Sequence, residues 1–189
     1  VTKIAEKITS HTQAIIPVHI FGNPCDMNAI CSIAKKHNLY IIEDAAEALG
    51  SKFTEGRYAG KMAGTIGDFG VYSFNGNKII STGGGGCVVS RHKEALEHIR
   101  YRSTQAKDDT LYFVHNEVGY NYRLTNVQAA IGCAQLEKLE SFIDHKHELY
   151  QVYLHIFTKA GIEMLPFRPD IRSNQWFFTI LWEENYSCS

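Results

Sequence analysis

Residues 67–86 read Gly-Asp-Phe-Gly-Val-Tyr-Ser-Phe-Asn-Gly-Asn-Lys-Ile-Ile-Ser-Thr-Gly-Gly-Gly-Gly. The apolar and aromatic run from Phe69 to Phe74 predicts a buried strand, and the polar turn after it carries one lysine, Lys78, ahead of four consecutive glycines. The glycines favour a tight turn and a close backbone approach that lead into a further strand over residues 87–90. The sequence therefore predicts an amine at the end of a buried strand.

Lys78 has two interpretations. A solvated loop lysine is the ordinary one, since most lysines are exposed. The alternative is a nucleophilic amine, because apolar strand residues lie behind Lys78 and Ser73 and Asn75 supply hydrogen-bonding groups close by. The stretch is neither a P-loop, in which glycine precedes the lysine, nor a dinucleotide fingerprint, in which the glycines open a helix.

The chain upstream predicts a strand, a helix and a second strand. Residues 14–19 form an apolar run, Asp26 is a candidate N-cap for a helix that ends near Lys36, and residues 39–43 form the next strand. This order predicts a parallel sheet, in which ligands bind outside the carboxyl ends of the strands. Asp44 lies at such an end. It could be a carboxylate that faces a ligand, or an ordinary helix-cap or loop aspartate. Because Lys78 lies at a second strand end, we favour the ligand-facing carboxylate.

The second half of the chain predicts mainly helix. A helix is expected over residues 91–102, followed by a polar, irregular segment. A long helix is expected from residue 127 to about Lys159, with a kink, because apolar residues keep helical spacing there. Residues 175–182 have the apolar and β-branched content of a strand.

The composition is that of a soluble globular protein with a sizeable core, since 44% of 189 residues are hydrophobic and 21% are charged. A net charge of -1 gives no electrostatic footprint for nucleic acid. No apolar run approaches the roughly 20 residues that cross a bilayer, so we expect no membrane span and a cytoplasmic location.

Five cysteines occur, with no C-x-x-C pair. Their odd number and spacing favour buried reduced thiols over disulfides. Neither they nor the nine histidines show the spacing of zinc ligands, so no metal site is expected.

Four motifs, taken together and in this order, resemble the DegT/DnrJ/EryC1/StrS family of sugar aminotransferases. They are Ala-Ile-Ile-Pro-Val-His-Ile-Phe-Gly-Asn-Pro-Cys-Asp-Met (residues 14–27), Ile-Glu-Asp-Ala-Ala-Glu-Ala-Leu-Gly-Ser (42–51), the stretch 67–86, and Gly-Tyr-Asn-Tyr-Arg-Leu-Thr-Asn-Val-Gln-Ala-Ala (119–130). The resemblance implies an α/β fold. The expected architecture is the aspartate-aminotransferase-like large domain of pyridoxal phosphate (PLP) fold type I, a mainly parallel sheet flanked by helices.

The resemblance also implies a division of the chain. Residues 1–160 are expected to form the second half of the PLP-binding large domain, and residues 161–189 the start of the C-terminal small domain. The chain begins without methionine and ends just after a strand-like run, so we expect a fragment that is incomplete at both ends. The family's phosphate-binding Gly-Ser/Thr turn and the aromatic residue that stacks on the cofactor belong upstream of Val1. Without them the chain alone is expected to bind PLP weakly and to be inactive.

The resemblance assigns roles to individual residues. Lys78 matches the lysine that bonds covalently to the cofactor aldehyde and later shuttles a proton. Asp44 matches the carboxylate that keeps the pyridine nitrogen protonated. Ser73 matches a hydroxyl that binds the cofactor phosphate. Asn75 and Glu47 occupy positions where the family places polar residues near the cofactor.

Asn121 resembles the asparagine that reaches the cofactor phosphate of the neighbouring subunit. This match implies a homodimer with a shared active site.

The implied reaction is transamination of a nucleotide-linked 4-keto-6-deoxy sugar, with glutamate as the usual amino donor. A branch of the family that carries histidine at the lysine position performs dehydration, so Lys78 favours transamination. Residues 73–78, 103–109 and 115–120 are most similar to aminotransferases of the legionaminic acid and bacillosamine routes, which act on 2-acetamido sugars. Two alternatives stay open: a truncated non-catalytic relative or regulator, and a nucleotide-sugar oxidoreductase, which the missing glycine fingerprint disfavours.

Overall fold

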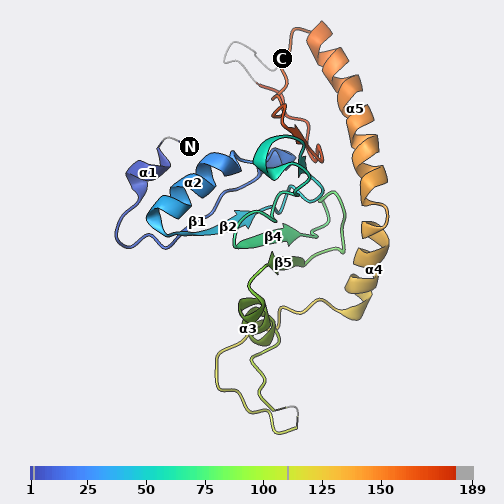
Figure 1. The fold of residues 1–189 in the computed structure, drawn as a ribbon. Coiled ribbons are helices and arrows are strands. Elements are labelled where there is room, and N and C mark those ends of the chain that lie inside the picture. Colours follow the sequence, from blue (N-terminus) through green and yellow to red (C-terminus); the bar gives the residue numbers. More distant parts are fainter. Residues whose placement is uncertain (2, 110, 182–189) are drawn as a thin grey trace, which may run out of the picture.

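A computed structural model describes residues 1, 3–109 and 111–181. Its main sheet has four strands in the order β1-β2-β4-β5 (Figure 1). These strands are β1 (Ala14–Ile15), β2 (Tyr40–Asp44), β4 (Phe69–Ser73) and β5 (Gly86–Ser90). The first three are parallel and β5 is antiparallel to β4. The predicted α/β fold with a mainly parallel sheet is confirmed.

Helix α2 (Met27–His37) connects the first two strands, as the sequence predicts. The Asp26 side chain accepts a hydrogen bond from the backbone N–H of Ala29 at 3.1 Å and so caps the helix. Asn38, with φ of 53°, ends the helix in the left-handed region that asparagine tolerates. Buried Ile30 packs on Ile41 of β2, so one face of the helix covers the sheet.

Strand β1 is shorter than the predicted strand over residues 14–19, because Pro17 has no N–H to donate. The chain nevertheless stays beside β2. The Pro17 carbonyl accepts from the Asp44 N–H at 2.9 Å, and the His19 N–H donates to the Asp44 carbonyl at 3.0 Å. Asp44 is thereby fixed at the carboxyl end of β2.

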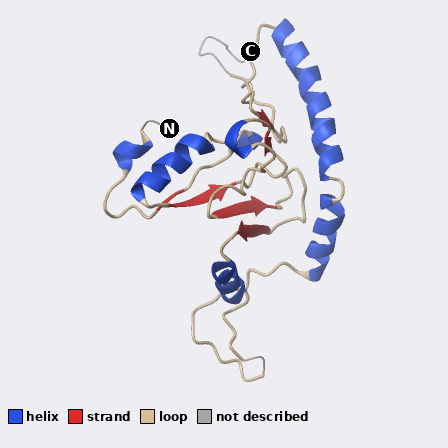
Figure 2. Ribbon diagram, in the orientation of Figure 1, coloured by secondary structure: helices blue, strands red, loops and turns tan. Residues whose placement is uncertain are grey.

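The helices after the sheet were predicted as helices, and their first and last residues lie close to the predicted ones. Helix α3 comprises Lys93–Ser103, α4 comprises Asn126–Leu136 and α5 comprises Leu139–Lys159. The expected long helix is thus two helices separated by residues 137–138; the sequence predicted a kink but not its position. Helices α4 and α5 follow each other along one side of the sheet, and α5 extends beyond it (Figure 2). Only Leu139 and Ile143 of α5 are buried, against the core next to the sheet.

The remaining elements are short. They are α1 (Ile4–Lys7), the 3-10 turns η1 (Ile20–Gly22) and η2 (Gly56–Tyr58), and the two strands β3 (Lys52–Phe53) and β6 (Ile171–Arg172). Strands β3 and β6 pair antiparallel and bring the C-terminal part of the chain back to the first half. Glu140 of α5 fastens this second sheet, because it accepts from Lys52 at 2.6 Å and from Arg172 at 2.9 Å.

The prediction of a strand over residues 175–182 is wrong for residues 175–181, which the structure describes. Trp182 lies outside the described residues. Only Ile180 forms a bridge, with Met164. Side chains satisfy the backbone locally instead: the Gln175 N–H donates to Ser173 Oγ and the Trp176 N–H donates to Asn174 Oδ1.

The cysteines depart in part from the expectation of buried thiols. Cys25, Cys31 and Cys87 are free and half-buried, whereas Cys133 is free and exposed on α4. Cys188 lies outside the described residues.

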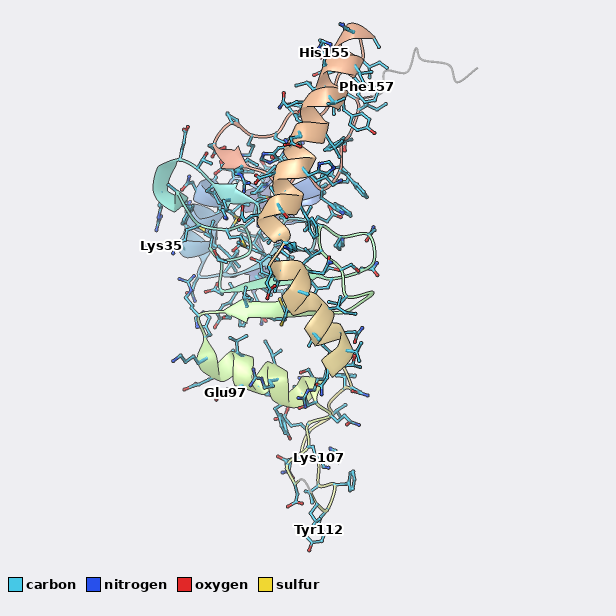
Figure 3. All side chains as sticks on the ribbon, turned by 90° about the vertical axis from the view of Figure 1, so that its right-hand side faces the viewer. Lys35, Glu97, Lys107, Tyr112, His155 and Phe157 are labelled. Atoms are coloured by element: carbon cyan, nitrogen blue, oxygen red, sulfur yellow. The ribbon has the colours of Figure 1, made fainter. Side chains whose placement is uncertain are left out.

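Residues 104–109 and 111–125 belong to a long loop that projects from the body of the molecule beyond α3 (Figure 3). Tyr112 lies at its far end and Lys107 part of the way along it, on the opposite side of the molecule from His155 and Phe157 near the end of α5. None of the helices in the described part of the chain is long and apolar enough to cross a membrane.

Candidate active site

The parallel pairing of β2 and β4 places two predicted site residues at one edge of the sheet. Asp44 is the register partner of Val71, and Ser73 ends β4 two residues later. Asp44 Oδ1 accepts from the N–H of Ala46 at 3.1 Å. The neighbouring Ala45 is fully buried.

Lys78 lies in the turn that follows β4 and is not a solvated loop lysine. Its side chain is only 13% exposed, and its Nζ lies 3.9 Å from Glu47 Oε1. The other carboxylate oxygen, Glu47 Oε2, accepts from the N–H of Phe21 at 2.8 Å. On another side of the amine lies the indole of Trp176, whose ring centroid is 4.2 Å from Nζ. Lys78 is therefore held between a carboxylate and an aromatic face.

The backbone of the turn fixes where the Lys78 side chain starts. The Lys78 N–H donates to the Asn75 carbonyl at 3.1 Å, and the Phe74 carbonyl accepts from the Thr82 N–H at 3.0 Å. Gly85, with φ of +83°, returns the chain to Phe74, whose N–H donates to the Gly85 carbonyl at 2.9 Å. The predicted tight glycine turn into a further strand is confirmed.

The other predicted site residues lie in two places, at the end of β4 and on the projecting loop. Ser73 Oγ accepts from the Asn75 N–H at 3.4 Å, so these two lie together at the end of β4, with Asn75 exposed. Asn121 lies on the projecting loop, exposed and bridged to Thr104. The structure thus joins Lys78 to Glu47 by contact and places Asp44 and Ser73 on the same edge. The role of Asn121 at a partner's site stays a prediction.

Sequence reasoning missed a buried polar pair next to Asp44, formed by Glu43 and His19. Glu43 Oε2 accepts from His19 Nε2 at 2.9 Å and from the Gly64 N–H at 2.8 Å, while Oε1 accepts from the N–H groups of Ile66 at 2.6 Å and Gly67 at 2.5 Å. Both side chains of the pair are fully buried. Burial alone would raise the pKa of Glu43, but the hydrogen bonds from His19, Gly67 and Gly64 lower it below the ordinary value.

Strand alternation contained a signal for this pair. Ile41 and Glu43 lie on one face of β2 and both are buried, as is Ala45 just after the strand. A glutamate in register with buried apolar residues needs several hydrogen-bond partners. Its partner His19 lies 24 positions away, and the sequence pattern does not predict which residue this partner is.

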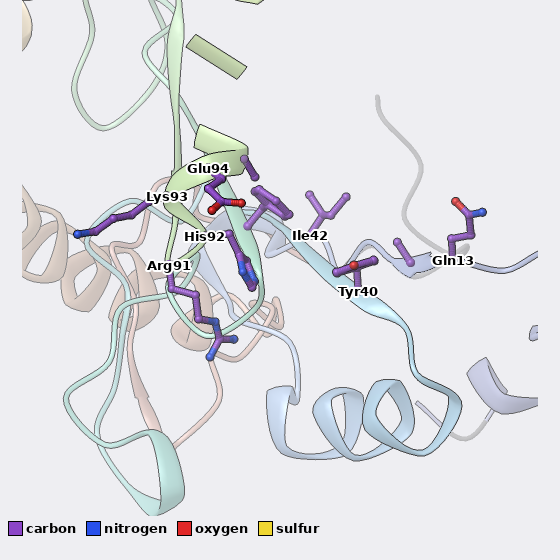
Figure 4. A pocket seen from close by; sticks show the side chains of 10 residues that line it. Gln13, Tyr40, Ile42, Arg91, His92, Lys93 and Glu94 are labelled. Atoms are coloured by element: carbon purple, nitrogen blue, oxygen red, sulfur yellow. The ribbon is translucent and has the colours of Figure 1, made fainter. Parts of the chain in front are cut away.

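A hollow of about 760 Å³ lies elsewhere, at the opposite ends of β2 and β4 (Figure 4). Its lining includes Tyr40, Phe69, Arg91 and His92, and none of the predicted site residues. Lys78 and Asp44 belong to the other edge of the sheet, so the candidate active site is assigned by chemistry and not by cavity size.

The donor set at the Lys78 edge suits PLP. An amine can bond to an aldehyde, a carboxylate can pair with a protonated ring nitrogen, and the Ser73 hydroxyl with the exposed end of β4 can donate to a phosphate. Among the described residues no group of three or more His, Cys, Asp or Glu could hold a metal ion.

Comparisons with known proteins agree with this chemistry. Residues 1–188 match the model of the DegT/DnrJ/EryC1/StrS aminotransferase family. The chain is 41% identical to GDP-perosamine synthase of Escherichia coli O157:H7, over 96% of this chain and 48% of that protein. It is 38% identical to dTDP-4-amino-4,6-dideoxy-D-glucose transaminase of Shigella dysenteriae, over 99% of this chain and 49% of that protein.

A solved structure has the same fold. PseC of Helicobacter pylori, an aminotransferase involved in the biosynthesis of pseudoaminic acid, superposes with a TM-score of 0.86 at 28% identity, over 96% of this chain and 48% of that one. The chain therefore spans about half the length of the relatives it matches.

Proposed function

This chain belongs to the DegT/DnrJ/EryC1/StrS aminotransferase family, and from that premise we propose that the complete protein transfers an amino group to a nucleotide-linked 4-keto-6-deoxy sugar. Aminotransferases of this family depend on PLP. The observation that carries the proposal is the Lys78 amine, 13% exposed and 3.9 Å from Glu47, at the sheet edge that also holds Asp44.

Bound PLP supplies an aldehyde for covalent attachment and a ring that accepts electrons. Lys78 supplies the amine that bonds to this aldehyde. Once free of that bond, the Lys78 amine would be the group that carries a proton to and from the substrate carbon. Asp44 would hold a proton on the ring nitrogen, Ser73 would bind the phosphate of the cofactor, and Asn75 would lie near the cofactor. Glu47 orients the Lys78 amine.

The names of two relatives support the substrate class. One is named for a GDP-linked sugar and another for a dTDP-linked 4-amino-4,6-dideoxy sugar, which supports amination at C4 of a sugar on a nucleoside diphosphate. The 2-acetamido group on the sugar and glutamate as the donor rest on the motif resemblance. Both are part of the proposal.

The proposal includes a homodimer, in which Asn121 of the projecting loop reaches the cofactor phosphate of the partner. The exposure of this loop in the described chain supports it. We further propose that residues 1–160 are the second half of the PLP-binding large domain and that residues 161–189 begin the small domain. The end of α5 at Lys159 supports this boundary. The cytoplasmic location stays a prediction.

Borohydride trapping tests the proposed function. The complete protein is incubated with PLP, reduced, digested and mapped by mass spectrometry. We expect a phosphopyridoxyl mass on the peptide that contains Lys78, because reduction makes the bond to the amine permanent. A folded complete protein without label on that peptide would contradict the aminotransferase proposal.

Asp44→Asn should lower the rate of transamination about 100- to 1,000-fold while part of the cofactor binding persists. A neutral amide cannot hold the proton on the ring nitrogen, and loss of one preorganised electrostatic partner costs about 2.7 to 4 kcal/mol in the transition state. Stopped-flow or steady-state kinetics of the complete protein measure the effect. Asp26→Asn is the matched control, since asparagine also caps a helix. Full activity in Asp44→Asn would refute the role of this carboxylate.

A further inference from the structure

The Trp176 indole lies directly on the Lys78 amine. Trp176 is 5% exposed, and its ring centroid lies 4.2 Å from Lys78 Nζ, within the range of a cation–π contact. The indole Nε1–H donates to the Asn77 carbonyl at 2.6 Å. Trp176 therefore contacts the turn at two points, the backbone beside Lys78 and the amine itself.

Trp176 is itself fixed on both sides. Its N–H donates to Asn174 Oδ1 at 3.1 Å, and its carbonyl accepts from Lys146 Nζ at 3.1 Å. The Asn174 amide donates to the carbonyls of Glu47 and Leu49, each at 2.9 Å. One fully buried asparagine thus joins the segment that carries Trp176 to the segment that carries Glu47.

A lysine side chain has many rotamers, and two attractive groups restrict this one. The Glu47 carboxylate lies 3.9 Å from the amine on one side, and the indole face covers another. We propose that Trp176 is a positioning residue for Lys78. The π face of its indole holds the Lys78 amine beside Glu47 and leaves one side of the amine open to a carbonyl compound. The proposal rests on the proposed function, in which Lys78 is the nucleophile.

A purely structural role for Trp176 would be to anchor residues 173–178 on the turn. Two substitutions separate the roles. Trp176→Phe keeps an aromatic face and loses the N–H donor to Asn77, whereas Trp176→Leu keeps apolar bulk and loses the face. Positioning through the π face predicts that Lys78 behaves differently in the two variants. Simple anchoring predicts the same behaviour in both.

The test is residue-specific amine labelling of the complete protein. Formaldehyde and cyanoborohydride are applied for a short time, and methylation is quantified by peptide mass mapping. In Trp176→Leu we expect the Lys78 labelling rate to rise about fivefold, the change that a cation–π contact of about 1 kcal/mol produces in an equilibrium. In Trp176→Phe it should stay within about twofold of the parent. The exposed lysines Lys36 and Lys159 are internal controls that should not change.

A second readout uses the cofactor. The PLP concentration that half-saturates borohydride trapping should rise about fivefold in Trp176→Leu and stay near the parent value in Trp176→Phe. Tyr40→Leu, an exposed aromatic position at the opposite end of β2, is the matched control and should behave like the parent. If Trp176→Leu does not fold, Trp176→Met gives the same comparison, because its side chain is also apolar without a ring.

The outcomes are distinct. Equal Lys78 labelling in the leucine and phenylalanine variants, or no change in either, overturns the positioning role. If PLP never labels Lys78 in the parent, the proposed function fails, and the formaldehyde comparison still decides whether Trp176 positions the amine.

Discussion

Replacing Lys78 by alanine should abolish the borohydride-stable PLP adduct on its peptide and lower transamination by the complete protein at least about 10⁴-fold. The variant loses both the covalent attachment and the proton transfer, and the second alone contributes about 10² to 10⁴. The fold should persist, because the backbone hydrogen bonds of Lys78, Phe74 and Thr82 fix the turn and do not involve the side chain. Mass mapping, kinetics and circular dichroism measure the three effects.

Lys78→Arg is the matched control for charge. Arginine keeps a cation near Glu47 and Trp176, so the electrostatic contacts and the stability should be retained. Its guanidinium does not bond to an aldehyde under these conditions, so labelling and transamination should be lost as in the alanine variant. Transamination at the parental rate in either variant would exclude Lys78 as the nucleophile.

The local part of the fold was predictable because it depends on neighbours in the sequence. Asp26 caps α2, the glycine turn leads into β5, and the strand–helix–strand order requires parallel pairing of β1 and β2. The strand expected near Gln175 failed for a local reason as well. Its flanking Ser173 and Asn174 bond to the backbone two residues on, which competes with a sheet ladder.

Of the candidate site, only the residues at the ends of the strands could be predicted from the sequence. Parallel neighbours share one carboxyl edge, so Asp44 and Lys78 could be expected together from the order of elements. The contacts that cover Lys78 could not. Trp176 lies 99 positions after Asn77 in the sequence. The pairing of β6 with β3 brings the segment that carries Trp176 back to the turn. Sequence periodicity carries no information about such a distant pairing.

The buried pair of Glu43 and His19 leads to the second large effect, which concerns stability. His19 Nδ1 accepts from the Cys25 N–H at 3.1 Å, so the ring proton lies on Nε2 and is donated to Glu43. Together with three backbone N–H groups, four donors share the two carboxylate oxygens. This network ties residues 64–67 and the His19 turn to the strand end that carries Asp44.

Glu43→Gln should lower the free energy of unfolding by about 3 to 5 kcal/mol, because the amide NH₂ would face donors that need an acceptor. Urea denaturation measures the loss. Glu140→Gln is the matched control: Glu140 pairs with Lys52 and Arg172 at the surface, and its loss should cost less than about 1 kcal/mol. Similar losses in the two variants would contradict the importance of the buried network.

The same carboxylate predicts a pH dependence with a definite sign. The folded-state pKa of Glu43 is lowered below its ordinary value of 4.5, because hydrogen bonds from His19 and two glycines outweigh the effect of burial. The unfolded chain therefore binds a proton at Glu43 at a higher pH than the folded chain does. This contribution to stability is complete above about pH 4.5 and is lost as the pH falls through the folded pKa. Glutamine cannot titrate, so the free energy of unfolding of Glu43→Gln should fall less steeply between about pH 5 and pH 3 than that of the parent. Parallel slopes would show that Glu43 is not a source of the acid sensitivity.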